Sequence, residues 1–358
     1  MEVGSNKSVD VRSNEEINIE ELNALLTAKN QVVGNVLSIR QFPGGFSNLT
    51  YLVETDTTNL VLRRPPAGAK HIKGGHDMMR EYRLLEAIKK SGFEQVPNPV
   101  FLSEGDNFLD APFYLMEKVD GVIFRASDAP NLLKTQPPET FKAISIALCD
   151  TLVDLHSIDI VKTDLVSIGK PEGYITRQVE GWYKRYEKSQ TDDLPVIKEL
   201  YDWLIKNIPT EQTPTLIHND FKYDNVVLNP ENLSEIRAIL DWEMTTVGDP
   251  LMDVGTALSY WCEARDDDFT KTFNLSWLPG NLTRQEFAAR YEAKSGRDLS
   301  NILYYYAFGL FKNSVVLQQI YNRFKLGLTK DPRFGSLIFG VKVLSTKAAK
   351  SIEKNRME

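Results

Sequence analysis

The fold is decided by two short stretches, LIHNDFKYDN at residues 216–225 and ILDWE at residues 239–243. In the first, Asp220 is followed five positions later by Asn225, and in the second the apolar run ends at Asp241. Between them lie two apolar runs separated by a polar turn, a pattern that predicts a β-hairpin. The hairpin would bring Asp241 back towards Asn225, so we expect two acids and one amide to share one site.

Asp220, Asn225 and Asp241 are the residue types that ATP-dependent phosphoryl transfer requires. One carboxylate accepts the proton of the attacking hydroxyl, while an amide oxygen and a second carboxylate hold Mg²⁺ on the triphosphate. We therefore predict Asp220 as the base, and Asn225 and Asp241 as metal ligands. Taken singly, each residue is more often structural, as part of a turn, a cap or a solvated strand end. Their combination at this spacing favours the catalytic interpretation.

A glycine-rich turn, PGGFSN at residues 43–48, joins two of the strand-like runs in the first third of the chain. Because it joins strand to strand, it is neither a Walker-type loop nor a dinucleotide fingerprint. Gly44 and Gly45 would let the backbone approach phosphate oxygens, and Ser47 and Asn48 would add donors. An ordinary hairpin turn is the alternative. The position upstream of Asp220 favours the phosphate interpretation.

Arg63 ends the third strand-like run, and Glu81 lies in the helix expected from about Met78 to Ser91. A cation at Arg63 would hold the α and β phosphates while pairing with a helix carboxylate, for which Glu81 is the candidate. In the alternative interpretation both are surface charges that contribute little to stability.

The apolar strand expected over residues 112–119 contains Met116, Glu117 and Val119. Main-chain groups at Glu117 and Val119 would bind an adenine, because a strand edge supplies both a donor and an acceptor. The alternative is a plain buried strand.

The expected secondary structure changes after residue 119, from short strands to helices. This predicts an α+β protein in which a small antiparallel β lobe with one main helix, residues 16–119, precedes a larger and mostly helical lobe, residues 120–358. The polar residues 1–15 are expected to be disordered.

The composition is that of a globular protein, with 42% hydrophobic and 25% charged residues over 358 positions. A net charge of −7 argues against a nucleic-acid partner, because phosphate backbones are bound by clustered Lys and Arg. No apolar run approaches the roughly 20 residues that span a bilayer, so no membrane partner is expected. The N-terminus lacks a secretory pattern, and Cys149 and Cys262 lie in apolar helical contexts, so we expect a cytoplasmic protein with buried, unpaired cysteines.

From Gly44 to about Asp253 the chain resembles the aminoglycoside phosphotransferase/choline kinase group of protein-kinase-like enzymes. Within that group it is similar to the branch that also occurs fused to acyl-CoA dehydrogenases. The resemblance rests on GFSNLTY at 45–51, LRRPP at 62–66, His76 ahead of REYR at 80–83, DWE at 241–243 and the tripeptide Gly248-Asp249-Pro250.

The resemblance implies a two-lobed protein-kinase-like fold that holds ATP and Mg²⁺ at the lobe junction. It implies transfer of the γ-phosphate to a hydroxyl of a small molecule, with Asp220 as base and Asn225 and Asp241 as metal ligands. Arg63 stands where a lysine is usual, so its phosphate contact would be forked. Asn219 stands where glycine is common, a change expected to alter the backbone angle of the loop.

Three functions remain open: a small-molecule kinase, a protein kinase, and a nucleotide-binding regulator without turnover. Only seven positions separate Asp241 from Gly248, too few for a peptide-binding activation segment, which disfavours a protein kinase. The intact set of Asp220, Asn225 and Asp241 argues against a regulator.

The acceptor pocket is expected in the helical lobe, where Arg177, Trp182 and Arg185 lie on one amphipathic helix. A basic, aromatic wall suits an anionic acceptor such as a hydroxyacyl-CoA, whereas aminoglycosides, which are polycations, call for an acidic pocket. Aminoglycosides, amino alcohols and sugars remain alternative acceptors. In the other interpretation Trp182 belongs to the core and the arginines are solvated.

Overall fold

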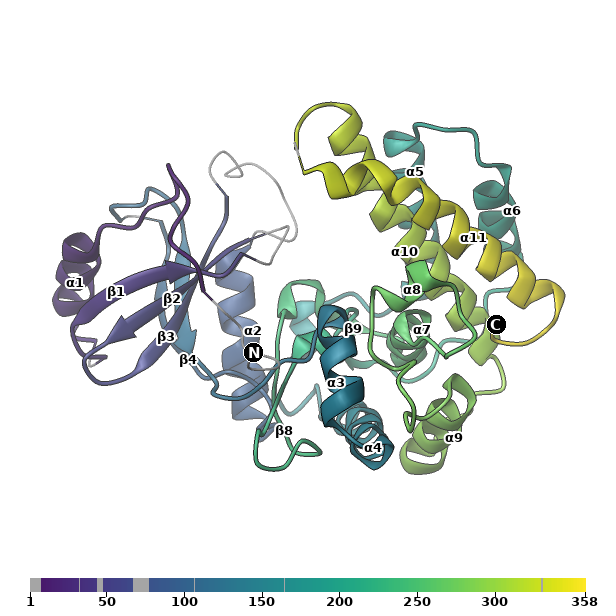
Figure 1. Ribbon diagram of the computed structural model, residues 1–358, viewed down its shortest axis with the longest axis horizontal. Helices are drawn as coiled ribbons and strands as arrows, with labels where there is room; N and C mark the ends of the chain where they lie inside the picture. The colour runs from purple at the N-terminus through teal and green to yellow at the C-terminus, as the bar shows by residue number, and fades with distance from the viewer. Residues whose placement is uncertain are drawn as a thin grey trace.

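Two parts of different construction make up the molecule, a sheet-based part at the N-terminal end and a larger helical part (Figure 1). The structure is a computed structural model that describes residues 8–31, 33–43, 48–66, 77–105, 107–163, 165–329 and 331–358. The α+β character predicted from the sequence is confirmed.

A five-stranded antiparallel sheet, in the order β1–β2–β3–β5–β4, forms the N-terminal part. Two helices accompany it, α1 (Ile19–Ala28) and α2 (Met78–Lys90). The strands are β1 (Val36–Gln41), β2 (Leu49–Thr55), β3 (Asn59–Arg64), β4 (Pro99–Ser103) and β5 (Phe113–Glu117).

The two faces of this sheet are covered by different helices, because successive side chains of a strand point to opposite faces. Leu60 and Leu62 of β3 pack in one apolar cluster with Leu22 of α1. Val61, between them, packs instead in the cluster that contains Leu85 of α2. The same alternation turns the next residue of β3, Arg63, to the α2 face.

Residues 8–15, which the sequence predicted as disordered, lie along the sheet. Val9 exchanges two backbone hydrogen bonds of 2.8 Å with Gln41 of β1. The Arg64 guanidinium donates to the Glu15 carbonyl at 2.9 Å. The polar composition of the segment gave no sign of this backbone pairing, because it does not depend on apolar side chains. Residues 1–7 lie outside the described ranges.

Helices dominate the C-terminal part, where α7 and α10 form its centre. They are α3 (Ala129–Thr135), α4 (Pro138–His156), α5 (Tyr174–Ser189), α6 (Pro195–Lys206), α7 (Pro250–Tyr260), α8 (Asp268–Lys271), α9 (Arg284–Ser295), α10 (Ile302–Lys325) and α11 (Leu337–Glu353). A Cβ on Gly255 of α7 would lie 2.3 Å from the Tyr305 carbonyl of α10, so glycine lets the two backbones touch.

Two small antiparallel pairs lie between α6 and α7. Strand β6 (Thr215–Ile217) pairs with β9 (Thr246–Gly248), and β7 (Val226–Leu228) pairs with β8 (Ile236–Ile239). The segment between β6 and β7 therefore faces the segment between β8 and β9. These are the segments that contain Asp220 and Asp241.

The chain crosses from the sheet to the helical part directly after β5. Val122 exchanges backbone hydrogen bonds with Leu228 of β7, and Gly121 lies so close that a Cβ would meet the Leu228 carbonyl oxygen at 2.5 Å. Arg80 of α2 donates to the Thr245 carbonyl, a second connection between the parts. We propose residues 16–119 and 120–358 as the two lobes.

In the described part of the chain, no helix is both long and apolar enough to cross a membrane.

Candidate functional site

Asp253 on α7 fixes the segment that contains Asp220 through two hydrogen bonds to its backbone. Its carboxylate accepts the backbone N–H of His218 at 2.6 Å and that of Asn219 at 2.8 Å. Burial opposes the charge of Asp253, but His156 and His218, including the His218 backbone N–H, outweigh it and lower the pKa of Asp253. Asp253 is fully buried, so this carboxylate fixes the backbone one residue before Asp220.

Asn219 adopts a left-handed conformation, with φ of +66°. This is a conformation that glycine adopts freely and that asparagine tolerates better than most residues. Its side chain donates to the Tyr174 hydroxyl at 3.2 Å and to the Met244 carbonyl at 3.1 Å. The asparagine therefore keeps the positive φ and adds two hydrogen bonds to it.

Asp220 is half-buried among donors. The Asn225 amide donates to its carboxylate Oδ2 at 2.8 Å, and Lys222 Nζ lies 3.3 Å from the same oxygen. Burial alone would raise the pKa of Asp220, but Lys222, Lys312 and a hydrogen bond from Tyr260 more than compensate and lower it. Asp220 is consequently ionised at neutral pH, the state that a general base requires.

The hairpin β7–β8 returns Asp241 to the side of Asn225, as the sequence predicted. Leu240 donates its N–H to the Asn225 carbonyl at 2.8 Å, and its own carbonyl accepts from His218 Nε2 at 3.0 Å. Asp241 follows with φ of +64°. Asp220, Asn225 and Asp241 thus occupy one small region of the molecule.

The donor set suits a magnesium ion. Both hydrogen bonds of the Asn225 amide nitrogen go to Asp220, one to its carbonyl and one to its carboxylate, each 2.8 Å long. This orientation leaves the Asn225 Oδ1 oxygen, which has no donor within the described residues, available to a metal ion. The Asp241 side chain is 40% exposed and supplies carboxylate oxygens. Oxygen atoms of these two kinds are what Mg²⁺ takes from proteins.

Arg63 lies at the centre of a buried charge network. Its guanidinium donates to Glu81 Oε1 at 2.6 Å, and the Tyr114 hydroxyl donates to the same oxygen at 2.8 Å. It also lies 3.4 Å from Asp241 and 3.5 Å from Glu243. Burial works against the charge of Arg63, but these carboxylates outweigh it and raise its pKa.

The pairing of Arg63 with Glu81 is a buried one, since the two residues are 7% and 2% exposed. The alternative of two solvated surface charges is therefore wrong. The network connects β3, α2 and the Asp241 segment, so it joins the two parts of the molecule at the predicted site.

Of the glycine-rich turn, Gly44, Gly45 and Ser47 lie outside the described residues. Asn48 is buried at the start of β2, and its amide donates to Glu243 Oε2 at 3.1 Å. This end of the predicted phosphate turn is thus directly connected to the Asp241 segment.

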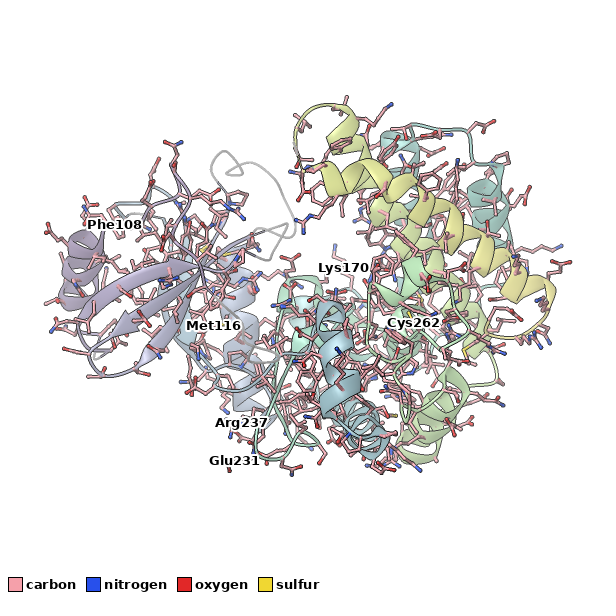
Figure 2. The ribbon with its side chains drawn as sticks, in the orientation of Figure 1. Phe108, Met116, Lys170, Glu231, Arg237 and Cys262 are labelled. Atoms are coloured by element: carbon pink, nitrogen blue, oxygen red, sulfur yellow. The ribbon has the colours of Figure 1, made fainter. Side chains whose placement is uncertain are left out.

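Met116, Glu117 and Val119 lie at the crossing between the two parts, where Figure 2 labels Met116. The Glu117 N–H donates to the Asn98 carbonyl at 2.8 Å, so it is not available to a ligand. Among the described residues the Val119 N–H has no acceptor. An adenine at this edge would meet the Val119 amide rather than that of Glu117.

The three residues proposed for the acceptor differ in their surroundings. Arg177 turns back to the start of its own helix and donates to the carbonyls of Glu172 and Lys170. Trp182 is buried, as the core alternative expected. Arg185 lies over the Trp182 ring, with its guanidinium carbon 4.5 Å from the ring centroid.

Four residues of the site were not identified from the sequence: Lys222, Glu243, Tyr260 and Lys312. Lys222 stands two positions after Asp220, a spacing that could have pointed to it. Lys312 comes from α10, 92 positions further along the chain, and no local pattern connects the two.

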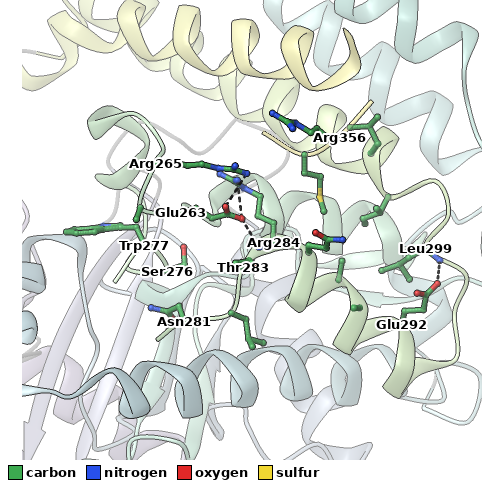
Figure 3. A pocket seen from close by; sticks show the side chains of 18 of the residues that line it. Glu263, Arg265, Ser276, Trp277, Asn281, Thr283, Arg284, Glu292, Leu299 and Arg356 are labelled. Atoms are coloured by element: carbon green, nitrogen blue, oxygen red, sulfur yellow. Dashed lines mark hydrogen bonds and ion pairs between the residues drawn. The ribbon is translucent and has the colours of Figure 1, made fainter. Parts of the chain in front are cut away.

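A separate cavity of about 1090 Å³ opens beside α9 and the C-terminal residues (Figure 3). Its charged groups are paired with one another, since Glu263 lies 3.5 Å from both Arg265 and Arg284. The cavity does not include Asp220, Asn225 or Asp241. We therefore place the candidate site at the junction and not in this cavity.

Comparison with known proteins decides the family. Residues 38–289 match the model of the phosphotransferase enzyme family, a span that contains every site residue described above except Lys312. The chain belongs to this family. The predicted resemblance is confirmed.

Members of the family appear among both sequence relatives and solved structures. Acyl-CoA dehydrogenase family member 10 of Mus musculus is 35% identical over 297 residues, which are 80% of this chain and 26% of that protein. The chain thus spans about a quarter of the length of this relative.

Among solved structures, a putative aminoglycoside phosphotransferase of Ralstonia eutropha is 26% identical, with a TM-score of 0.79 over 95% of this chain and 99% of the other. An aminoglycoside phosphotransferase in complex with GDP and kanamycin is 16% identical, with a TM-score of 0.64 over 93% and 99%. The predicted protein-kinase-like fold of this group of enzymes is confirmed.

Proposed function

We propose that this phosphotransferase moves the γ-phosphate of ATP to a hydroxyl of a small molecule in a reaction that depends on Mg²⁺. The single observation that carries the proposal is the orientation of Asn225. Its amide nitrogen is committed to Asp220, which holds the base in place, while its oxygen remains for a metal beside Asp241.

Asp220 takes the proton of the acceptor hydroxyl in this proposal. The bond from Asn225 and the charge of Lys222 orient its carboxylate and keep it ionised. A positioned base of this kind contributes typically about 10²–10⁴-fold in rate. Asn225 and Asp241 hold Mg²⁺, which when bound neutralises charge on the phosphate oxygens.

Arg63 contacts the phosphates in place of the usual lysine, held in position by Glu81. A guanidinium presents a planar fork of donors, so it can retain Glu81 with one nitrogen and meet phosphate oxygens with another. Asn48 and the turn before it complete the phosphate site, and the edge at Val119 takes the adenine.

For the acceptor we propose a hydroxyacyl-CoA. The support is the group of Trp182, Arg185 and Lys312 beside the Asp220 segment, together with a relative whose name includes acyl-CoA dehydrogenase. Aminoglycosides, amino alcohols and sugars are the alternative acceptors, and a regulator without turnover is the alternative function.

The test is an ATP-consumption assay of the purified chain with Mg²⁺ over these four acceptor classes. We expect turnover with at least one hydroxyacyl-CoA. Asp220→Asn should lower kcat by about 10²–10⁴-fold, whereas Asp202→Asn, a surface change on α6, should have no effect. Turnover with an aminoglycoside alone would reassign the acceptor. Absence of turnover with every class would leave the regulator as the better account.

A further inference from the structure

Lys312 is a buried cation with few partners. It lies in the middle of α10, is 3% exposed, and its Nζ donates to the Asn219 carbonyl at 2.5 Å. An ammonium group has three N–H donors. Within the described ranges this is its one recorded hydrogen bond, and no carboxylate oxygen lies at ion-pair distance. Burial of a lysine without an ion-pair partner is costly, so such groups concentrate at functional sites.

Arg185 and Lys222 lie close enough to Lys312 to act on its charge. Lys312 Nζ lies 5.9 Å from the centroid of the Trp182 ring, and the Arg185 guanidinium carbon lies 4.5 Å from it. Lys222 is the third cation, 3.3 Å from the Asp220 carboxylate. The two helices that contribute Trp182 and Lys312, α5 and α10, pack against each other (Figure 1).

The surroundings of Lys312 favour its charged form less than water does. Burial and the positive charges of Lys222 and Arg185 oppose its charge, while Asp220 and Asp253 support it, and the pKa of Lys312 falls to about 8. Lys312 and Arg185, which both lie over the Trp182 ring, repel each other. An anion between them would remove this repulsion and occupy the remaining N–H donors.

We propose that Lys312 and Arg185, on the surface of Trp182, bind an anionic oxygen group of the acceptor, a carboxylate or a phosphate, and thereby select acceptors beside Asp220. The inference rests on the proposed function, because it takes Asp220 as the base that meets the acceptor hydroxyl. Arg177 is no part of this subsite, since its guanidinium is bound to the carbonyls of Glu172 and Lys170.

Three acceptors with one hydroxyalkyl chain test the proposal: a hydroxy acid, its CoA thioester and the corresponding neutral diol. Binding is measured by calorimetry, independently of turnover, and KM and kcat are measured with ATP and Mg²⁺. In Lys312→Met and in Arg185→Met, we expect the Kd and KM of the anionic acceptor to rise about tenfold or more, since a charge-assisted hydrogen bond is lost. The Kd of the diol should stay within about twofold.

A stronger effect on the hydroxy acid identifies a carboxylate as the bound group, and a stronger effect on the thioester identifies the phosphates of CoA. Lys325→Met, an exposed lysine at the end of the same helix, is the matched control and should change nothing. Arg185 is exposed, so Arg185→Met tests the same subsite without the risk of misfolding that comes with a change at the buried Lys312. Equal losses with diol and anions would show a purely structural role and overturn the proposal.

Failure of the kinase assignment gives a different result. If ATP is not turned over but the wild-type chain binds an anionic acceptor through Lys312 and Arg185, the subsite stands without the proposed function. If ATP is turned over and neither anionic acceptor binds more tightly than the diol, the subsite is wrong and the kinase assignment stands.

Discussion

At the scale of single residues, the hydrogen bonds of His218 determine its charge. Nε2 lies 3.0 Å from the Leu240 carbonyl and must donate to it, while Nδ1 accepts the N–H of Asp220 at 3.2 Å. A ring that accepts at one nitrogen is neutral. Burial also disfavours the charged ring and lowers the pKa of His218. The Asp220 segment is therefore built for a neutral histidine.

This predicts a loss of stability in mild acid. Because the pKa of His218 is lower in the folded chain than the ordinary value near 6.5, the unfolded chain binds the proton first. The contribution of His218 is complete above about pH 6.5 and declines below it, by at most about 1.4 kcal/mol per pH unit. Urea unfolding at pH 7.5 and 5.5 should show a smaller decline in His218→Phe than in the wild-type chain. Identical declines in the two chains would contradict this account.

Asn219 provides a second prediction at this scale. At φ of +66° an alanine is strained and a glycine is not, while both remove the side-chain bonds to Tyr174 and Met244. Asn219→Ala should therefore unfold at lower urea than Asn219→Gly, with a difference of about 1 kcal/mol. Equal stability of the two variants would mean that the left-handed conformation is not retained.

At the scale of elements, the contact between α7 and α10 positions both sides of the site. Asp253 of α7 accepts the backbone N–H of Asn219, and Lys312 of α10 donates to the Asn219 carbonyl. Their backbones approach at Gly255 and Gly309, where an added Cβ on either would lie within 2.5 Å of a backbone oxygen. The spacing of the two helices thus fixes the distance between two groups that hold Asn219.

Gly255→Ala should force α10 away from α7. We expect the free energy of unfolding to fall by about 1–3 kcal/mol, as for other overpacked cores, measured by urea unfolding. Gly181→Ala is the matched control, because the helical Gly181 of α5 has room, with the nearest atom to an added Cβ at 3.7 Å. A Gly255→Ala variant as stable as this control would contradict the close approach.

Sequence patterns predicted the elements that depend on local signals. The hairpin around Asn225 and Asp241 and the helix from Met78 follow from turn residues and apolar periodicity, and both are present. The pairing of β6 with β9 was not predicted, because three-residue strands about 30 positions apart carry too little pattern. Lys312 was missed for a similar reason, since its role comes from tertiary packing and not from its neighbours in the chain.

At the scale of the whole molecule, polar and charged groups join the two parts. Arg63 and Asn48 from the sheet meet Glu243, and Arg80 from α2 meets the Thr245 carbonyl. Each of these contacts lies within five residues of Asp241. The segment that follows the predicted metal ligand is therefore also the place where the two parts are attached, which explains why nucleotide binding and the relative position of the parts should be coupled.

The most direct test of the account is calorimetric titration with ATP, in the presence and absence of Mg²⁺, for the wild-type chain, Asp220→Ala and Asp241→Ala. We predict that Mg²⁺ tightens ATP binding in the wild-type chain and in Asp220→Ala, and that it has no such effect in Asp241→Ala. Asp220→Ala should bind the nucleotide and fail to transfer phosphate. Tightening by Mg²⁺ that is unchanged in Asp241→Ala, or normal turnover by Asp220→Ala, would contradict the assignment of these two acids.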